Sequence, residues 1–414
     1  MNGFVRPDFR GVAQTFERQL PRSQPGGAAL CIYHRGERVV DIWGGSRDRA
    51  GMPWTADTLS LSFSTTKGVV STLLHILASR GMLDYDTPVS HYWPAFAQNG
   101  KAAITVRQLL CHEAGLYGIR SLVKDAAEMR DWPHMLQLLE QSAPVHRPGE
   151  RNGYHALTFG WLVGGLVEKI SDKALAQVLR EELTEPLQLE GCFIGVPDAE
   201  MPRCADLITP EKKPRDPQAS PRQKKGPSLQ QRVIDRALRL SGFDPDSTRE
   251  AMVPHGMGRF DWNTAEARKA CIPGAGGMFT ARSLAKIYAA LGHDGAFEGA
   301  RILPPGTVAR LAKVQNTSRG AVVPLPMRWR MGYHRVFTTG PRTPHAFGHF
   351  GYGGSGAWCD PSRQLGVGYV VNFGTGTPFG DMRLCQLNTA AIRAVDSLPR
   401  LLWQWVSKRG RGGA

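Results

Sequence analysis

The sequence has β-rich runs near both ends and helical periodicity through its middle. Residues 27–44 read as two strands joined by a turn at residues 34–37, and residues 327–373 are strand-rich again. Between residues 104 and 190 the apolar positions recur at helical spacing, and a final helix is expected around residues 381–407. This order predicts an α/β part built from both ends of the chain, with a helical part inserted in the middle.

A serine and a lysine three positions apart stand where a strand-like segment passes into an apolar helix. Ser64 and Lys67 lie in LSFSTTKGVV, and an almost uncharged run continues to Gly81. Residues three apart share one face of a helix, so the hydroxyl and the amine lie within reach of each other. A buried lysine is costly unless it is paired or neutral, and a neutral amine can take the seryl proton. The pair therefore indicates an activated nucleophile, although a serine helix cap followed by a solvated lysine has the same spacing.

Motifs for other chemistries are incomplete. Gly351 to Gly356 match GxGxxG, but the following residues are typical of a turn and a strand, where a dinucleotide site needs a helix. His112 and Glu113 begin an HExxH pattern that Leu116 breaks. Neither GxxxxGK[ST] nor GxSxG occurs in the sequence. We therefore expect no cofactor and no metal.

Composition predicts a soluble globular protein. Hydrophobic residues make up 42% of the 414 positions, and no stretch approaches eighteen apolar residues in a row. The seven cysteines are scattered without a CxxC pair, which favours reduced thiols. We expect a cytoplasmic protein that has no membrane span.

Positive charge is concentrated in one proline-rich stretch. The chain has 51 Lys+Arg and 36 Asp+Glu, a net charge of +15, and residues 201–240 alone hold ten Lys/Arg against four Asp/Glu. Such a stretch is typical of a solvated insertion, so no nucleic-acid partner is expected. One interpretation is a flap over the active site that tunes substrate choice.

Several ordered blocks accompany Ser64 and Lys67. They read GMLDYDTPVSHYWPAF, ITVRQLLCHEAGL, PGERNGY, PGAGGMFTARSLAKI and HFGYGGSGAWCDP. Together they resemble the serine β-lactamase-like hydrolases, especially the branch of class C β-lactamases, family VIII carboxylesterases and DD-peptidases. The resemblance covers roughly residues 20–200 and 265–375. It implies an antiparallel sheet flanked by helices, with an inserted, mostly helical domain.

The domain boundaries expected from this resemblance divide the chain into three parts. Residues 1–62 and 265–414 form the α/β domain, residues 63–200 form the helical domain, and residues 201–264 form the basic insertion, for which the family offers no match.

The resemblance also implies roles for individual residues. Ser64 matches the nucleophile that becomes acylated, Lys67 matches its activating amine, and Tyr154 matches a tyrosine that passes a proton to the leaving group. Tyr154 needs nearby positive charge to act as a base, and Lys67 could supply it. His349 and Gly351 match the third family motif on the strand beside the active site, as substrate-binding residues. The main-chain N–H groups of Ser64 and Tyr352 would form the oxyanion hole.

Two departures from the family pattern bear on the substrate. Ala156 stands where the tyrosine motif usually has an asparagine, and His349 stands where many members have a lysine. His155 is a candidate to enter the pocket in place of the missing amide, with a place at the surface or behind the pocket as the equal alternative, whereas His112 is interpreted as structural. Both departures favour a carboxylesterase that acts on small esters. A β-lactamase, a D-amino-acid peptidase or amidase, or a transacylase would use the same site, and a non-catalytic scaffold is the alternative of another class.

Overall fold

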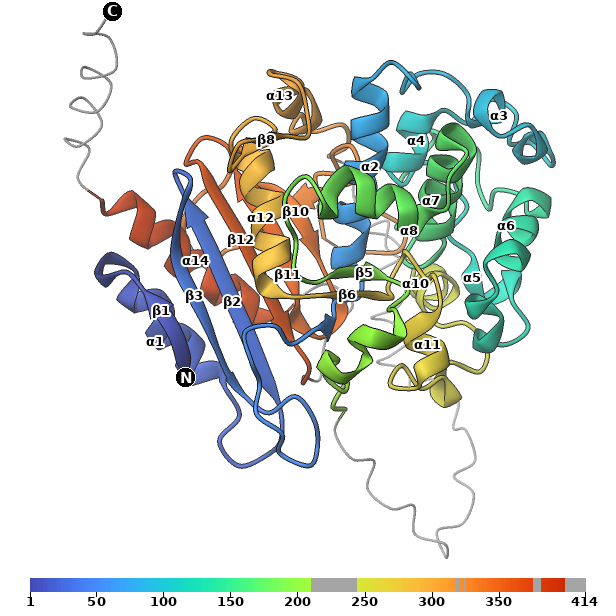
Figure 1. Ribbon diagram of the computed structural model, residues 1–414. Coiled ribbons are helices and arrows are strands. Elements are labelled where there is room, and N and C mark those ends of the chain that lie inside the picture. The colour runs from blue at the N-terminus through green and yellow to red at the C-terminus, as the bar shows by residue number, and fades with distance from the viewer. Residues whose placement is uncertain (210–243, 318–319, 324, 375–380, 399–414) are drawn as a thin grey trace, which may run out of the picture.

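A seven-stranded antiparallel sheet forms one half of the molecule (Figure 1). The computed structural model describes residues 1–209, 244–317, 320–323, 325–374 and 381–398. The strand order is β1-β3-β2-β12-β11-β10-β9, so strands from the beginning and the end of the chain are hydrogen-bonded at its centre. The strands are β1 (Asn2–Val5), β2 (Gly27–His34), β3 (Glu37–Gly45), β9 (His334–Arg335), β10 (Phe347–Phe350), β11 (Gly356–Asp360) and β12 (Leu365–Val371).

The expected hairpin at residues 27–44 is confirmed by β2 and β3. His34 pairs with Glu37, and the two residues between them, Arg35 and Gly36, have φ values of 53° and 83°. Positive φ at both central positions is the geometry that two-residue hairpins prefer, because its twist matches that of the strands. The turn therefore fixes the register of the first strand pair.

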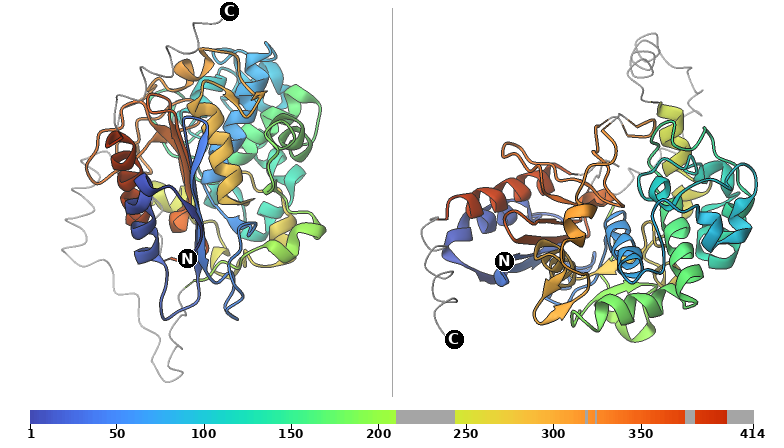
Figure 2. Two further views of the ribbon diagram at one scale, coloured as in Figure 1. Left: turned by 60° about the vertical axis from the view of Figure 1, so that its left-hand side comes forward. Right: turned by 90° about the horizontal axis from the view of Figure 1, so that it is seen from above.

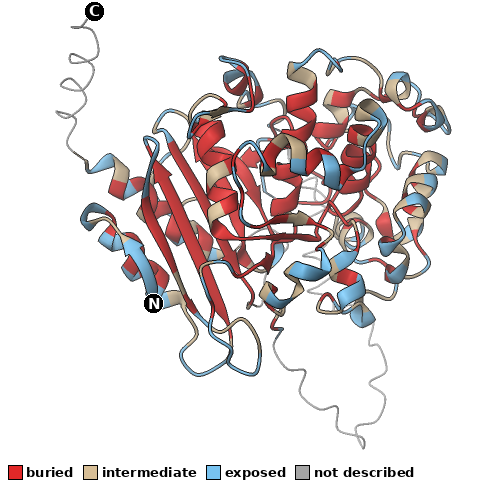
Figure 3. Cartoon of the chain, in the orientation of Figure 1, coloured by how far each residue is buried: buried red, intermediate tan, exposed pale blue. Residues whose placement is uncertain are grey.

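Helices cover both faces of the sheet (Figure 2). Helix α12 (Ala281–Gly292) packs on β2, β11 and β12, while α1 (Arg10–Gln19) and α14 (Met382–Asp396) pack on each other across the other face. Successive side chains of β2 point to opposite faces of the sheet: Cys31 packs on the α12 side and Leu30 on the α1 side. Both faces of the central strands β2, β11 and β12 are thus buried, whereas the edge strand β1 is exposed (Figure 3).

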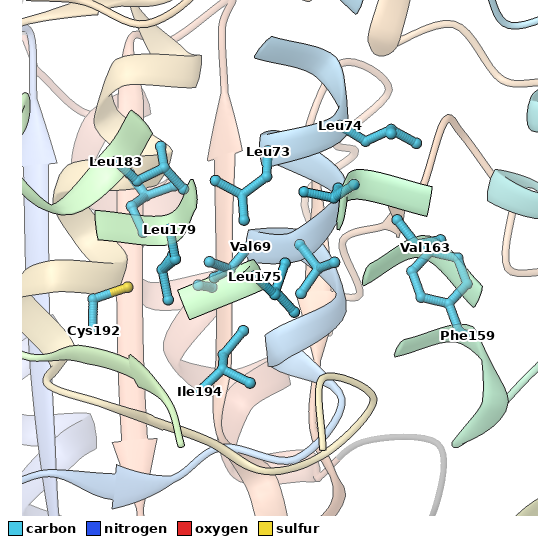
Figure 4. Packing of buried hydrophobic residues seen from close by; sticks show 14 of the residues in the cluster. Val69, Leu73, Leu74, Phe159, Val163, Leu175, Leu179, Leu183, Cys192 and Ile194 are labelled. Atoms are coloured by element: carbon cyan, nitrogen blue, oxygen red, sulfur yellow. The ribbon is translucent and has the colours of Figure 1, made fainter. Parts of the chain in front are cut away.

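The other half of the molecule is helical and is built around α2 (Thr65–Ser79), which is buried for most of its length. Val69 and Leu73 of α2 lie among Leu175, Leu179 and Ile194 (Figure 4). Helix α7 (Thr158–Ser171) packs against α2 from the helical side, and β10 packs against it from the sheet side. Helix α2 therefore lies at the junction of the two halves.

The remaining elements complete these two halves. A small sheet has the order β4-β6-β5 and joins β4 (Ser60–Leu61), β6 (Gly277–Phe279) and β5 (Cys192–Ile194). Further helices are α3 (Val89–Tyr92), α4 (Val106–Leu110), α5 (Ile119–Leu122), α6 (Trp132–Gln141), α8 (Leu175–Leu179), α10 (Pro245–Met252), α11 (Ala265–Lys269) and α13 (Thr307–Leu311). The short helical turns and two-residue strands are η1 (Pro7–Phe9), η2 (Pro94–Ala97), η3 (Ala126–Arg130), η4 (Arg180–Thr184), η5 (Asp198–Arg203), η6 (Met257–Arg259), η7 (Tyr352–Gly354), β7 (Ala296–Phe297) and β8 (Ala300–Arg301).

The sheet draws its strands from residues 2–45 and 334–371, in line with an α/β part made from both ends of the chain. Most of the basic stretch at residues 201–240 lies outside the described residues, as do residues 399–407 of the expected last helix. The three domain boundaries stay a prediction. Among the residues described, no helix has both the length and the apolar character that a bilayer crossing demands.

Candidate active site

Ser64 stands at the first turn of α2, directly after a residue with unusual backbone geometry. Phe63 has a φ of 43°, a left-handed conformation that costs a non-glycine residue free energy and persists only where the surroundings enforce it. Its ring is held by edge-to-face contacts with Trp262 and Tyr352, at centroid distances of 5.5 and 5.4 Å. This sharp bend between β4 and α2 turns the Ser64 side chain toward a cavity.

Lys67 is fully buried, and its amine makes three polar contacts. Its Nζ lies 2.8 Å from Ser64 Oγ, 2.5 Å from the carbonyl oxygen of Ala156 and 2.6 Å from that of Gly274. Among the described residues no carboxylate pairs with it, and burial lowers the pKa of its amine well below the usual value. In the neutral amine, the two carbonyls accept both N–H groups and the lone pair faces the Ser64 hydroxyl. The arrangement suits a general base.

The two carbonyls reach Lys67 because the main chain packs closely behind it. A Cβ added at Gly274 would lie 2.3 Å from the carbonyl oxygen of Leu157, so only glycine allows the approach of this loop to the start of α7. The loop belongs to the PGAGG block, which the sequence marks as a family motif without indicating its purpose.

Tyr154 lies beside both residues. Tyr154 and Ser64 line the same cavity, and the Lys67 Nζ sits 5.2 Å from the centre of the Tyr154 ring. Burial raises the pKa of the phenol above its usual value. With Lys67 neutral and the phenol buried, Tyr154 keeps its proton and is suited to donate it, whereas the sequence had suggested a phenol made basic by a charged lysine.

Trp329 and two histidines hold the Tyr154 ring in place. The Trp329 indole stacks on it with centroids 5.4 Å apart and planes inclined by 15°. His112 meets its edge at 4.9 Å, and His349 lies nearly parallel to it at 6.2 Å. Stacking on several sides restricts the phenol to one position.

The two N–H groups expected at the oxyanion hole meet at the contact between β10 and the start of α2. A Cβ built at Gly351 would lie 2.2 Å from the carbonyl oxygen of Ser62, so glycine is required by contact with the protein's own main chain. Within the described part of the chain, the N–H groups of Ser64 and Tyr352 have no hydrogen-bond acceptor. Both donors are free to bind a substrate oxygen.

A cavity of 820 Å³ opens above Ser64. Ser64, Tyr154 and Ala156 lie at its base, and Lys67 lies beneath them. We call these four residues the catalytic floor. The opposite side, which we call the insertion wall, consists of Leu207, Thr209, Pro245, Thr248, Arg249, Met252, Val253, Met257, Gly258, Arg259, Phe260, Asp261, Trp262 and Asn263. Most large side chains of the wall are apolar, so the cavity suits a substrate with a hydrophobic body.

Comparison with known proteins identifies the family of this chain. The beta-lactamase family model matches residues 12–387. The chain belongs to the beta-lactamase family. It is 37% identical over 377 residues to the esterase/beta-lactamase LipL of Mycobacterium tuberculosis, a match that covers 89% of this chain and 82% of LipL.

Two solved structures are similar to this protein over nearly its whole chain. A family VIII carboxylesterase has a TM-score of 0.80 and 32% identity, covering 95% of this chain and 99% of its own. A penicillin-binding protein homologue from Caulobacter crescentus has a TM-score of 0.80 and 33% identity, with the same coverage. The expected β-lactamase-like fold is confirmed, and the protein is a serine hydrolase of the beta-lactamase family.

His349 is placed differently from the expected substrate anchor. His349 is only 1% exposed and does not line the cavity. Its Nδ1 lies 3.2 Å from the carbonyl oxygen of Phe350. Burial, with His334 and Lys67 nearby, lowers the pKa of its imidazole well below the usual value. A neutral, enclosed imidazole cannot neutralise a substrate carboxylate, so its contact with Tyr154 makes it a positioning residue.

His155 also lies away from the cavity. Its Nε2 accepts a hydrogen bond from the Leu116 N–H at 3.0 Å, and its main-chain N–H donates to His112 Nδ1 at 3.1 Å. Burial lowers the pKa of its imidazole to about 3. His155 therefore braces the loop behind Tyr154 and offers no side-chain donor to the cavity. The interpretation of His112 as structural agrees with the same contacts.

Proposed function

We propose that this protein is a carboxylesterase that hydrolyses small esters through an acyl-enzyme on Ser64. The observation that supports this most strongly is the environment of Lys67: a buried amine, 2.8 Å from the Ser64 hydroxyl, whose other two contacts are main-chain carbonyls. Such an amine has no structural ion pair to make and is suited to proton transfer.

Acylation would pass a proton from Ser64 through Lys67 and Tyr154 to the leaving group. Lys67 takes the proton of the Ser64 hydroxyl as Oγ bonds to the ester carbonyl carbon, and the N–H groups of Ser64 and Tyr352 stabilise the oxyanion. The bond from that carbon to the alcohol oxygen then breaks. Tyr154 donates its proton to the departing alkoxide and recovers one from Lys67, which leaves an acyl-Ser64 and a free alcohol. Water attacks the acyl group in the same way, with Ser64 as leaving group.

Three features of the site favour esters over β-lactams. Ala156 offers no side-chain amide to a substrate amide, His349 offers no charge to a substrate carboxylate, and the cavity is mainly apolar. An ester needs less help at its leaving group than an amide, because an alkoxide departs more readily than an amine. The names of LipL and of the family VIII carboxylesterase, which include esterase activity, support the same assignment.

The test is a hydrolysis screen with p-nitrophenyl esters of graded chain length, run beside a chromogenic cephalosporin and D-amino-acid amides. A fluorophosphonate probe should label the wild-type protein and fail to label Ser64→Ala. We expect ester hydrolysis to exceed turnover of both amide classes. Efficient cephalosporin turnover above that of every ester would overturn the substrate assignment, and absence of labelling would support a scaffold without catalysis.

A further inference from the structure

One face of α10 lines the insertion wall. Pro245, Thr248, Arg249, Met252 and Val253 all border the cavity. Their spacing of three and four residues places them on a single helical stripe. The helix begins at Asp244, whose side chain accepts hydrogen bonds from the N–H groups of residues 246 and 247. Arg249 is therefore held in the middle of a cavity-facing stripe on a capped helix.

The Arg249 guanidinium has no ion pair or hydrogen bond with any other described residue. The other charged groups of the wall are occupied. Arg259 donates to Asp125 at 2.7 Å, and the Asp261 carboxylate accepts a hydrogen bond from the Asn263 N–H at 2.9 Å without pairing with Arg249. An arginine is charged at any physiological pH and carries five donors, so Arg249 brings to the cavity a cation that no described side chain pairs with.

The surroundings of Arg249 define what it could bind. Met252, Val253, Phe260 and Trp262 make the neighbouring wall apolar, and the reacting Ser64 lies at the base of the same cavity. A substrate that fills this space would place an apolar body between the serine and the guanidinium. Because His349 is buried and neutral, the cation that the third motif usually supplies is missing from its family position.

We propose that Arg249 is a specificity-determining residue that binds a carboxylate at the far end of the substrate. The preferred substrates would be esters with an apolar body and one terminal carboxylate. The carboxylate would be carried by the part of the ester that occupies the cavity, either the acyl chain or the alcohol. This inference rests on the proposed esterase function and adds to it the charge of the substrate.

The experiment compares matched pairs of esters in wild-type protein, Arg249→Ala and Arg249→Lys. One pair is p-nitrophenyl hydrogen glutarate and p-nitrophenyl valerate, which differ at the end of the acyl chain. The other is 4-carboxyphenyl butyrate and phenyl butyrate, which differ on the alcohol side. Arg10→Ala removes the same charge from an exposed position of α1, on the far face of the sheet, and is the control.

We expect Arg249→Ala to lower the ratio of kcat/KM for the charged ester to that for the neutral ester about fivefold to tenfold, in one of the two pairs. Arg249→Lys should retain part of the ratio, Arg10→Ala should leave it unchanged, and added salt should reduce it in the wild type. A ratio that Arg249→Ala changes less than twofold in both pairs would overturn the proposal while ester hydrolysis persists. Absence of hydrolysis of all four esters would instead overturn the proposed function.

Discussion

The catalytic floor and the insertion wall face the same cavity but are built in different ways. At the floor, the base Lys67 is fully buried and its amine has three oxygen contacts. The wall comes from segments on either side of residues 210–243 and includes the exposed Arg249, with which no described side chain forms an ion pair. A group that transfers protons must be held in place and shielded from water, whereas a group that selects substrates must be accessible to them. We therefore expect changes in the floor to alter turnover and changes in the wall to alter preference.

The strongest test of this difference is Lys67→Ala. Loss of the base should lower kcat for a short-chain ester about 1,000- to 10,000-fold, because binding energy cannot replace proton transfer. Lys101 provides a matched control, since it is also buried and its Nζ donates to the carbonyl oxygens of Gln98, Glu140 and Ser142. Burial lowers the pKa of its amine to about 8. Lys101→Ala should reduce the melting temperature and preserve kcat per folded molecule. A Lys67→Ala protein with near wild-type kcat would contradict the assignment.

Tyr154→Phe should have the next largest effect. Only a hydroxyl is removed, and the ring can keep its stacking on Trp329, so the melting temperature should stay close to that of the wild type. Without the proton donor, kcat should fall about 100-fold. The loss should be smaller for p-nitrophenyl esters than for alkyl esters, since p-nitrophenolate leaves without protonation. If kcat on alkyl esters is the same in the variant and the wild type, Tyr154 only packs in the core and does not donate the proton.

Acid should destabilise the folded protein through histidines that are buried outside both the floor and the wall. Burial lowers the pKa of His155 to about 3 and that of His334 to about 4, while an unfolded histidine titrates near pH 6.5. Between these values the unfolded chain binds protons that the folded protein excludes, so the free energy of unfolding falls as the pH falls. Each of these histidines should contribute a loss of about 2 kcal/mol between about pH 7 and pH 5.

Urea unfolding at the two pH values measures this loss. A free energy of unfolding that is the same at both pH values would show that these histidines are not buried in the neutral form.

The wall offers the smallest expected effect. Met252→Trp places a larger side chain on the cavity-facing stripe of α10 and should reduce the space available to a long chain. We expect the ratio of kcat/KM for p-nitrophenyl octanoate to that for the acetate to fall about tenfold. If kcat for both esters falls equally, the wall acts on the chemistry itself, and the distinction between floor and wall is wrong.

Much of the fold was readable from periodicity. The hairpin at residues 27–44, the helix after Ser64 and the strand at residues 365–371 follow from local patterns of apolar residues and turn glycines. The closeness of Ser64 and Lys67 follows from helix geometry alone. Tyr154 was identified only through the family resemblance, because no local pattern distinguishes it from a packing tyrosine.

The sequence by itself determined which residues could react: a serine and a lysine on one helix face, and the motif that supplies Tyr154. The tertiary structure decided which of these residues are protonated and which are accessible to a substrate. Lys67 is held in its neutral form by the main-chain carbonyls of Ala156 and Gly274. Every residue has a main-chain carbonyl, so the sequence does not indicate which ones contact the lysine. Burial excluded His155 and His349 from the cavity, and the cavity itself combines segments far apart in the chain. Protonation and access depend on desolvation by the whole fold, and residue identity alone does not encode that desolvation.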